Sequence, residues 1–322
     1  MAEAAPLETS DAIGVDVGGT KINALRLNSA GEILARSVGA TPADDMQATL
    51  DVLVRTARDV WSPAVAGIGI GAAGLIDRRS GVLICAPNLV WRDANIERVV
   101  TDALGLPATV DNDCTTGGYA EWRLGAARGL RDVLYVGLGT GIGGGLVVGG
   151  RLHRGALGLA GEIGHFIVEP DGHECGCGNR GCWETVASGT AITRQGHEAA
   201  TRHAHSLIAE MAGGDPTAVT GVTVTEAARA GDPAARGILA EVGTRLGEGI
   251  AGLVNILDPE VVVVGGGPAE AGDLLLDPAR AAYARTVEGR ALRPSVRIVP
   301  AALGPDAAAI GAALLVLDER PG

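Results

Sequence analysis

Residues 12–31 read AIGVDVGGTKINALRLNSAG. Two apolar runs, 12–17 and 21–27, flank the turn Gly18-Gly19-Thr20, and a second turn follows at 28–31. Short apolar runs bounded by turn residues predict β-strands, so this stretch predicts a hairpin. Residues 32–38 can add a third strand to the same sheet.

The segments after this hairpin alternate between helical and strand patterns. They are a helix over 45–61, a strand buried on both faces at 65–71, a helix near 94–104 and a strand near 108–110. This order predicts an α/β domain rather than a sandwich or a helical bundle.

The pattern restarts at residues 132–150, DVLYVGLGTGIGGGLVVGG, where two apolar runs again flank a glycine turn. Two related halves are therefore expected. The remaining segments are a Gly- and Cys-rich loop at 155–182, helices over 188–255, a strand at 260–264 ending in Gly265-Gly266-Gly267, a strand at 295–299 and a last helix at 306–317.

Composition and charge exclude several classes of protein. The 322 residues carry a formal net charge of -12, which argues against a general nucleic-acid binder. No apolar run reaches the ~18–20 residues of a membrane span, and the N-terminus lacks the features of a signal peptide. We expect a soluble, cytoplasmic protein, in which the five cysteines do not form a disulfide framework.

Both glycine turns have the composition of a phosphate-binding loop. Turns without Cβ atoms let backbone N–H groups approach an oxyanion, and Thr20 and Thr140 add hydroxyl donors. Asp16, at a predicted strand end, is a candidate to hold Mg²⁺ through water. Neither turn has the spacing of a Walker loop or of a dinucleotide fingerprint. The alternative is that these glycines only form hairpins.

Asn112 and Asp113 follow a short apolar strand and open a helical stretch. A carboxylate at such a strand end faces the crevice where α/β sheets bind ligands. Phosphoryl transfer to a sugar hydroxyl needs a carboxylate that accepts the proton, so Asp113 is the candidate base. Asn112 is a candidate hydrogen-bond partner for the sugar. Asp113 as an ordinary helix N-cap is the alternative.

The sequence GEIGH at 161–165 is followed by CGCGNRGCWE at 175–184. Three thiolates and one imidazole form a closed tetrahedral Zn²⁺ site, which is structural rather than catalytic. The predicted ligands are Cys175, Cys177, Cys182 and His165, with His173 as a rival for the imidazole. A redox pair or free core cysteines are the alternatives, and Trp183 is interpreted as a packing residue.

Together, DVGGTK at 16–21, the 137–145 turn, EIGH at 162–165 and the cysteine motif resemble the ROK family of repressors, open reading frames and kinases. Within that family the chain is most similar to bacterial ATP-dependent glucokinases. The resemblance implies an actin-like (RNase H-like) two-domain α/β ATPase fold, with ATP in the cleft and closure on sugar binding. It also implies a homodimer or homotetramer and no nucleic-acid or membrane partner.

The family's functional residues map onto this sequence. Asp113 is the implied base toward the sugar 6-hydroxyl. The implied sugar ligands are Gly71, Asn88, Asn112, Asp113, Glu162, His165 and Glu184. The implied ATP-binding residues are Asp16, Gly18, Gly19, Thr20, Lys21, Thr140, Gly141, Gly143, Gly265 and Gly266, with Mg²⁺ accompanying ATP. The expected domains are a small one at 1–120, onto which a helix at about 305–322 packs back, and a large one at 121–304 with the zinc loop.

Three other functions compete with glucose phosphorylation. N-acetylmannosamine, N-acetylglucosamine, fructose or allose are possible acceptors, because the Glu-x-x-His element occurs in several groups of the family, and polyphosphate is a possible donor. A sugar-sensing repressor would carry an N-terminal DNA-binding domain, for which a first strand near residue 12 leaves no room. A zinc hydrolase is opposed by the closed ligand set.

Overall fold

The computed structural model describes residues 10–86 and 91–319. The chain divides into two compact units, each described by itself below. Unit 1 comprises 1–124, 154–160 and 306–322, and unit 2 comprises 125–153 and 161–305. The short segment 154–160, within the expected large domain, therefore belongs to unit 1.

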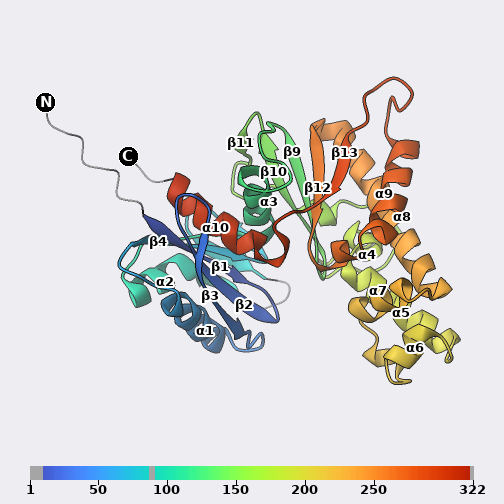
Figure 1. The fold of residues 1–322 in the computed structure, drawn as a ribbon, viewed down its shortest axis with the longest axis horizontal. Coiled ribbons are helices and arrows are strands. Elements are labelled where there is room, and N and C mark those ends of the chain that lie inside the picture. The colour runs from blue at the N-terminus through green and yellow to red at the C-terminus, as the bar shows by residue number, and fades with distance from the viewer. Residues whose placement is uncertain (1–9, 87–90, 320–322) are drawn as a thin grey trace, which may run out of the picture. The chain divides into compact units, whose positions relative to one another are not determined.

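Unit 1 contains a five-stranded sheet in the order β3-β2-β1-β4-β8 (Figure 1). Its strands are β1 (Asp11–Val17), β2 (Lys21–Leu27), β3 (Ile33–Ala40), β4 (Val65–Ala72) and β8 (Ala108–Asn112). The first three strands are antiparallel, whereas β4 and β8 run parallel to β1. The predicted hairpin and its third strand are confirmed.

Helices cover both faces of this sheet. They are α1 (Met46–Asp59), α2 (Ile96–Leu104), α3 (Asp113–Arg123) and α10 (Ala307–Asp318). Leu50 and Leu53 of α1 pack with Ile13 and Ile68 of the sheet in one buried cluster. Helices α3 and α10 lie on the other face (Figure 1). A small antiparallel sheet, which the sequence did not reveal, consists of β5 (Leu75–Asp77), β6 (Val82–Cys85) and β7 (Arg92–Asn95).

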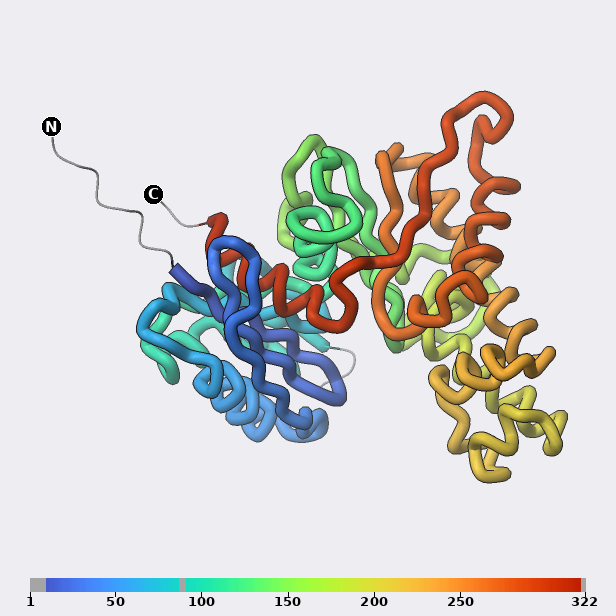
Figure 2. The backbone as a smooth tube through the Cα atoms, in the orientation of Figure 1, coloured from blue at the N-terminus to red at the C-terminus, as the bar shows by residue number. Residues whose placement is uncertain are grey.

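The C-terminal helix α10 lies directly against the N-terminal strand, as the red and blue segments of the tube show (Figure 2). Two strand glycines permit this approach. A Cβ atom on Gly14 would lie 1.8 Å from the carbonyl oxygen of Ala309, and one on Gly69 would lie 1.9 Å from that of Ala312. Side chains at these positions would overlap the helix backbone.

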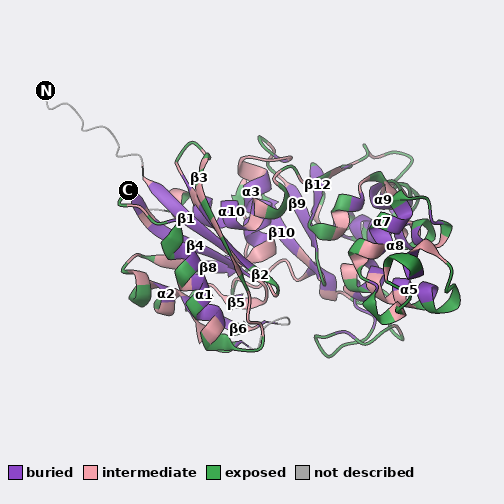
Figure 3. Cartoon of the chain, turned by 60° about the horizontal axis from the view of Figure 1, so that its bottom comes forward, coloured by how far each residue is buried: buried purple, intermediate pink, exposed green. Residues whose placement is uncertain are grey.

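Unit 2 contains a second five-stranded sheet in the order β11-β10-β9-β12-β13. Its strands are β9 (Val133–Leu138), β10 (Ile142–Val148), β11 (Arg151–Leu152), β12 (Val261–Gly265) and β13 (Arg297–Pro300). Its helices are α4 (Glu184–Ala187), α5 (Gly189–Arg202), α6 (Leu207–Met211), α7 (Gly221–Arg229), α8 (Pro233–Leu257) and α9 (Asp273–Thr286). The central strands β9 and β12 are almost fully buried (Figure 3).

Both sheets share one topology. In each, three antiparallel strands are followed by two strands parallel to the first, and the spatial order is third, second, first, fourth, fifth. The two related halves expected from the repeated glycine turn are therefore present in the fold.

One long helix was not predicted. Helix α9 contains Pro278, which has no backbone N–H and reads as a helix breaker in sequence. Pro278 lies in the second turn of the helix, where little of the helix precedes it. Within residues 10–86 and 91–319, no helix combines the length and apolar character of a membrane span.

The close approach of α10 gives a first prediction. Gly69→Ala is expected to lower the free energy of unfolding by about 1–3 kcal/mol, because the new methyl group meets backbone that cannot rotate away. Chemical denaturation measures the change. The control is Gly252→Ala on α8, where a Cβ meets nothing within 4 Å. That variant should be stabilised by about 0.5–1 kcal/mol. Equal effects in the two variants would contradict this account of the packing.

Candidate functional site

The carboxyl ends of three parallel strands in unit 1 meet at one edge of the sheet. Asp16 of β1 is in register with Gly71 of β4, and Gly71 is in register with Asp111 of β8. Asn112 ends β8, and Asp113 begins α3. Open α/β sheets bind ligands outside the carboxyl ends of their strands. Four residues predicted from sequence, Asp16, Gly71, Asn112 and Asp113, thus lie at one edge of unit 1.

The N-cap of α3 is Asn112. Its Oδ1 accepts hydrogen bonds from the backbone N–H groups of Cys114, at 2.9 Å, and Thr115, at 3.1 Å, while its Nδ2 donates to Gly74 O at 3.3 Å. The alternative of Asp113 as N-cap is therefore wrong. Asp113 is the first helical residue, and its Oδ1 accepts the N–H of Cys114 at 2.8 Å. Its carboxylate lies at the positive end of the helix dipole.

Burial and like charges shift the acidic groups of this edge. Burial raises the pKa of Asp113, against the lowering effect of the hydrogen bond from Cys114. Burial, followed by the charges of Asp113 and Asp306, raises the pKa of Asp16 to about 7, although Lys21 lowers it. Carboxyl groups with raised pKa values are typical of sites that bind a cation or accept a proton.

The first glycine turn is a tight hairpin connection. Gly18 N donates to Lys21 O at 3.1 Å. Thr41 braces the turn from outside the motif, because its N–H donates to Thr20 O at 3.0 Å and its Oγ1 donates to Gly18 O at 2.8 Å. The sequence did not reveal that Thr41 contacts this turn. Its position just after the third strand is the one available signal.

The second glycine turn is fixed by the start of α5. Gly139 O accepts the N–H of Gly189 at 2.9 Å, and Thr140 O accepts both the N–H and the Oγ1 of Thr190, at 3.3 and 2.7 Å. A Cβ atom on Gly189 would lie 2.5 Å from Gly139 O. Gly189 and Thr190 were also missed, because they lie fifty residues further along the chain.

The third glycine cluster follows the neighbouring parallel strand. Gly265 of β12 is in register with Gly137 of β9. Gly266 has φ +90°, and a Cβ atom there would lie 1.9 Å from Leu138 O. The loops after β9 and β12 are therefore adjacent in unit 2, which places Gly265 and Gly266 beside the turn that holds Thr140.

The four predicted metal ligands converge in unit 2. The ligand atoms of His165, Cys175, Cys177 and Cys182 all lie within 4.8 Å of one another. Cys175 Sγ is 3.6 Å from His165 Nδ1, and Cys177 Sγ is 3.6 Å from Cys182 Sγ. Thiolates bound at about 2.3 Å to a tetrahedral ion lie at about this spacing, so the donor set fits zinc. His173 is not part of the group.

His165 also faces two carboxylates. Its Nδ1, on the cysteine side, is 3.7 Å from Glu184 Oε1, and its Nε2 is 3.9 Å from Glu162 Oε2. Glu184 Oε1 is 3.0 Å from Cys175 Sγ, and its Oε2 accepts the N–H of Ile142 at 3.2 Å. Glu162 and Glu184, which the family resemblance implies as sugar ligands, thus lie beside His165 of the metal-ligand group.

Buried aromatic packing holds the cysteine loop against α8. Trp183 is fully buried, its Nε1 donates to Arg245 O at 2.9 Å, and its ring centroid is 5.2 Å from that of Phe166. A Cβ atom on Gly249 would lie 2.1 Å from the indole. The interpretation of Trp183 as a packing residue is confirmed, and this packing fixes the backbone next to Glu184.

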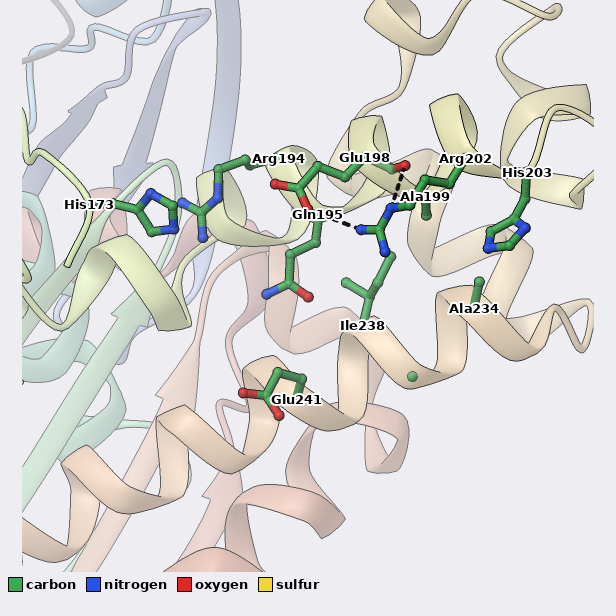
Figure 4. Close-up of a pocket in the computed structure, with 11 residues that line it drawn as sticks. His173, Arg194, Gln195, Glu198, Ala199, Arg202, His203, Ala234, Ile238 and Glu241 are labelled. Carbon is green, nitrogen blue, oxygen red and sulfur yellow. Dashed lines mark hydrogen bonds and ion pairs between the residues drawn. The ribbon is translucent and has the colours of Figure 1, made fainter. Parts of the chain in front are cut away.

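A pocket of about 450 Å³ in unit 2 is lined chiefly by α5 and α8 (Figure 4). Its charged groups already have partners, because Arg194 Nη1 donates to Thr185 O at 2.9 Å and Arg202 Nη2 donates to Glu198 Oε2 at 3.1 Å. His173, the rival zinc ligand, lines this pocket. The pocket includes none of the predicted site residues.

The predicted residues thus fall into separate groups. Unit 1 holds Asp16, the Gly18–Lys21 turn, Gly71, Asn112 and Asp113, and unit 2 holds the second turn, the glycine cluster, the metal ligands, Glu162 and Glu184. Asn88 lies outside the described residues.

Comparison with known proteins extends these observations over nearly the whole chain. The chain is 37% identical over 312 residues to the glucokinase of Streptomyces coelicolor, covering 96% of this chain and 98% of that one. It is 28% identical to the xylose repressor of Bacillus subtilis, covering 95% of this chain and 77% of that one.

Among solved structures, a ROK family glucokinase from Streptomyces griseus in complex with glucose and AMPPNP has a TM-score of 0.88 and 38% identity. The match covers 95% of this chain and 99% of that one. The α/β, actin-like ATPase fold implied by the resemblance is thus confirmed. The model of the ROK family matches residues 12–319, and the chain therefore belongs to the ROK family.

Proposed function

We propose that this protein is an ATP-dependent glucokinase, which transfers the γ-phosphoryl group of ATP to the 6-hydroxyl of glucose. The observation that carries the proposal is the Asp113 carboxylate, held at the carboxyl edge of a sheet beside a glycine turn. Support comes from the relatives named glucokinase, one of which was solved with glucose and AMPPNP.

Asp113 is the proposed general base. Its carboxylate would accept the proton of the 6-hydroxyl as that oxygen attacks the γ-phosphorus and the bond to ADP breaks. A base is most effective when its pKa lies near the working pH, so the raised pKa of Asp113 suits this role. The N-cap bonds of Asn112 keep the carboxylate at the start of α3.

The proposed ATP site uses the backbone of the glycine turns. The N–H groups of Gly18, Gly19 and Thr20, and those of the turn from Thr140 to Gly143, would bind phosphate oxygens. Gly265 and Gly266 would lie near the adenosine, and Lys21 would add a positive charge. Asp16 would hold Mg²⁺ through water, which offsets the phosphate charge.

The proposed sugar ligands are Gly71, Asn88, Asn112, Asp113, Glu162, His165 and Glu184. Zinc bound by His165, Cys175, Cys177 and Cys182 would have a structural role. With Nδ1 of His165 on the metal side, Nε2 would remain on the Glu162 side, 3.9 Å from that carboxylate, and would help to orient it. Other hexoses and N-acetylhexosamines are the alternative acceptors, and ADP release against a panel of these sugars distinguishes them.

The xylose repressor relative raises a second, non-catalytic function. A net charge of -12 opposes DNA binding by this chain. A gel-shift assay that detected specific DNA binding, with no ADP release on any sugar, would replace the kinase proposal with a repressor.

Removal of the base is the central test of the proposed reaction. Asp113→Asn is expected to lower kcat by about 10²–10⁴-fold, because the amide cannot accept the proton, while the Kd for ATP stays unchanged. A coupled ADP assay and calorimetric titration measure the two quantities. Asp273→Asn is the matched control, because Asp273 is also the first residue of a helix but is exposed. Unchanged turnover in Asp113→Asn would remove the base assignment.

The metal prediction concerns the cysteine loop. Cys177→Ser is expected to reduce the zinc content and to raise the KM for glucose or lower the melting temperature, because Glu162 and Glu184 lose their anchor. Metal analysis, steady-state kinetics and thermal unfolding provide the measurements. Cys85→Ser, outside the ligand group, should leave all three unchanged. Full activity with an unaltered KM in metal-stripped protein would contradict the structural role.

The raised pKa of Asp16 predicts how stability depends on pH. A group whose folded pKa lies above its unfolded value of 3.8 costs stability as the pH rises toward about 7, since the folded state must then lose a tightly held proton. Without divalent ions, Asp16→Asn should therefore raise the melting temperature relative to wild type at about pH 8, and much less at about pH 4.

A control of opposite sign is available in the same unit. Hydrogen bonds from Arg79 and Ser80 lower the pKa of Asp77, so Asp77→Asn should lower the melting temperature at about pH 8 and lose that effect in acid. If Asp16→Asn and Asp77→Asn changed the melting temperature with the same pH dependence, the raised pKa of Asp16 would not be the cause of the change.

A further inference from the structure

A buried ion pair lies directly behind the proposed base. Asp111 of β8 is buried, and its Oδ2 accepts a hydrogen bond from Arg154 Nε at 2.6 Å. Its Oδ1 accepts the N–H of Asn112 at 2.9 Å. A buried carboxylate without a cation is strongly disfavoured, so Arg154 holds this strand end in place. The two residues that follow Asp111 are the N-cap Asn112 and the base Asp113.

Arg154 comes from an unusual part of the chain. The segment 154–160 belongs to unit 1, although the residues on both sides of it, 125–153 and 161–305, belong to unit 2. Ala160 N donates to Arg154 O at 3.0 Å and closes this segment into a loop. Glu162, a proposed sugar ligand, follows only two residues later. Arg154 therefore ties the first residue of this loop to the strand end before Asp113.

The surrounding charges make Arg154 the direct donor to Asp111. Arg78 Nε is 3.8 Å from Asp111 Oδ2, too far for a hydrogen bond, and has no such partner among the described residues. Glu319 bridges the two arginines, with its carboxylate 2.8 Å from Arg154 Nη2 and 2.8 Å from Arg78 Nη2. Arg154 thus holds Asp111 and is itself held by Glu319.

We propose that Arg154 is a positioning residue for phosphoryl transfer: through Asp111 it fixes the end of β8, from which Asn112 and Asp113 follow. The inference rests on the proposed function, in which Asp113 is the base. Displacement of a reacting group by about 1 Å can lower a rate by on the order of 10²-fold, so the effect should appear in kcat.

Arg154→Met is the primary test. It is expected to lower kcat for glucose by on the order of 10²-fold with little change in the KM for ATP. Arg154→Lys, which keeps the charge but not the Nε donor, should recover part of the loss. Arg79→Met is the matched control, because it breaks an ion pair of the same unit whose arginine side chain is 68% exposed. Its kcat should equal that of wild type.

The double variant Arg154→Met with Asp111→Asn separates positioning from stability. The single variant leaves a buried carboxylate without its donor, which destabilises the fold. The asparagine removes that charge but still accepts the N–H of Asn112, so the melting temperature should recover while kcat stays low. Recovery of kcat together with stability would overturn the proposal, and the double variant keeps it testable if Arg154→Met alone does not fold.

Hydrogen exchange of neighbouring backbone amides reports, without any substrate, whether the local structure at Asn112 and Asp113 is kept. In the double variant, the amides of Cys114 and Thr115, which donate to Asn112 Oδ1, should exchange faster than in wild type or in Arg79→Met. Unchanged exchange would overturn the positioning role whether or not the protein is a glucokinase. Absence of turnover in wild type would instead contradict the proposed function, so the two failures are distinguishable.

Discussion

The register of three parallel strands brings the candidate site residues of unit 1 to one edge of the sheet. Asp16, Gly71 and Asp111 occupy one row across β1, β4 and β8, so the strands end together and α3 begins at their common edge. Gly71 permits α3 to start there, since a Cβ atom would lie 2.8 Å from Thr116 Oγ1. The sheet therefore fixes the position of Asp113, the first residue of α3, which carries the carboxylate.

In unit 2 the carboxylates lie at the ends of a glycine-rich loop, which needs contacts that hold it in one conformation. Glu162 and Glu184 are far apart in sequence, yet both lie beside His165, and Glu184 also lies beside Cys175. A metal ion bound by the Cys and His ligands would connect the two ends of this loop, and Trp183 already packs it onto α8. Such an ion would hold the two carboxylates, which an unbraced loop would leave mobile.

The sequence was informative where spacing and residue type act locally. The hairpin turns, the metal-ligand set and the strand before Asp113 follow from short motifs. What it could not reveal depends on contacts between distant segments. Thr190 closes on Thr140 only after folding, and the pair of Arg154 with Asp111 joins residues 43 positions apart. Helix α9 was missed because Pro278 obscured its pattern.

The central claim is that the Asp113 carboxylate faces the hydroxyl that receives the phosphoryl group. A crystal structure of this protein with glucose and AMPPNP tests it most directly. The account predicts an oxygen of Asp113 within about 2.6–3.2 Å of the sugar 6-hydroxyl. A carboxylate turned away from the sugar, with another side chain at that hydroxyl, would contradict it.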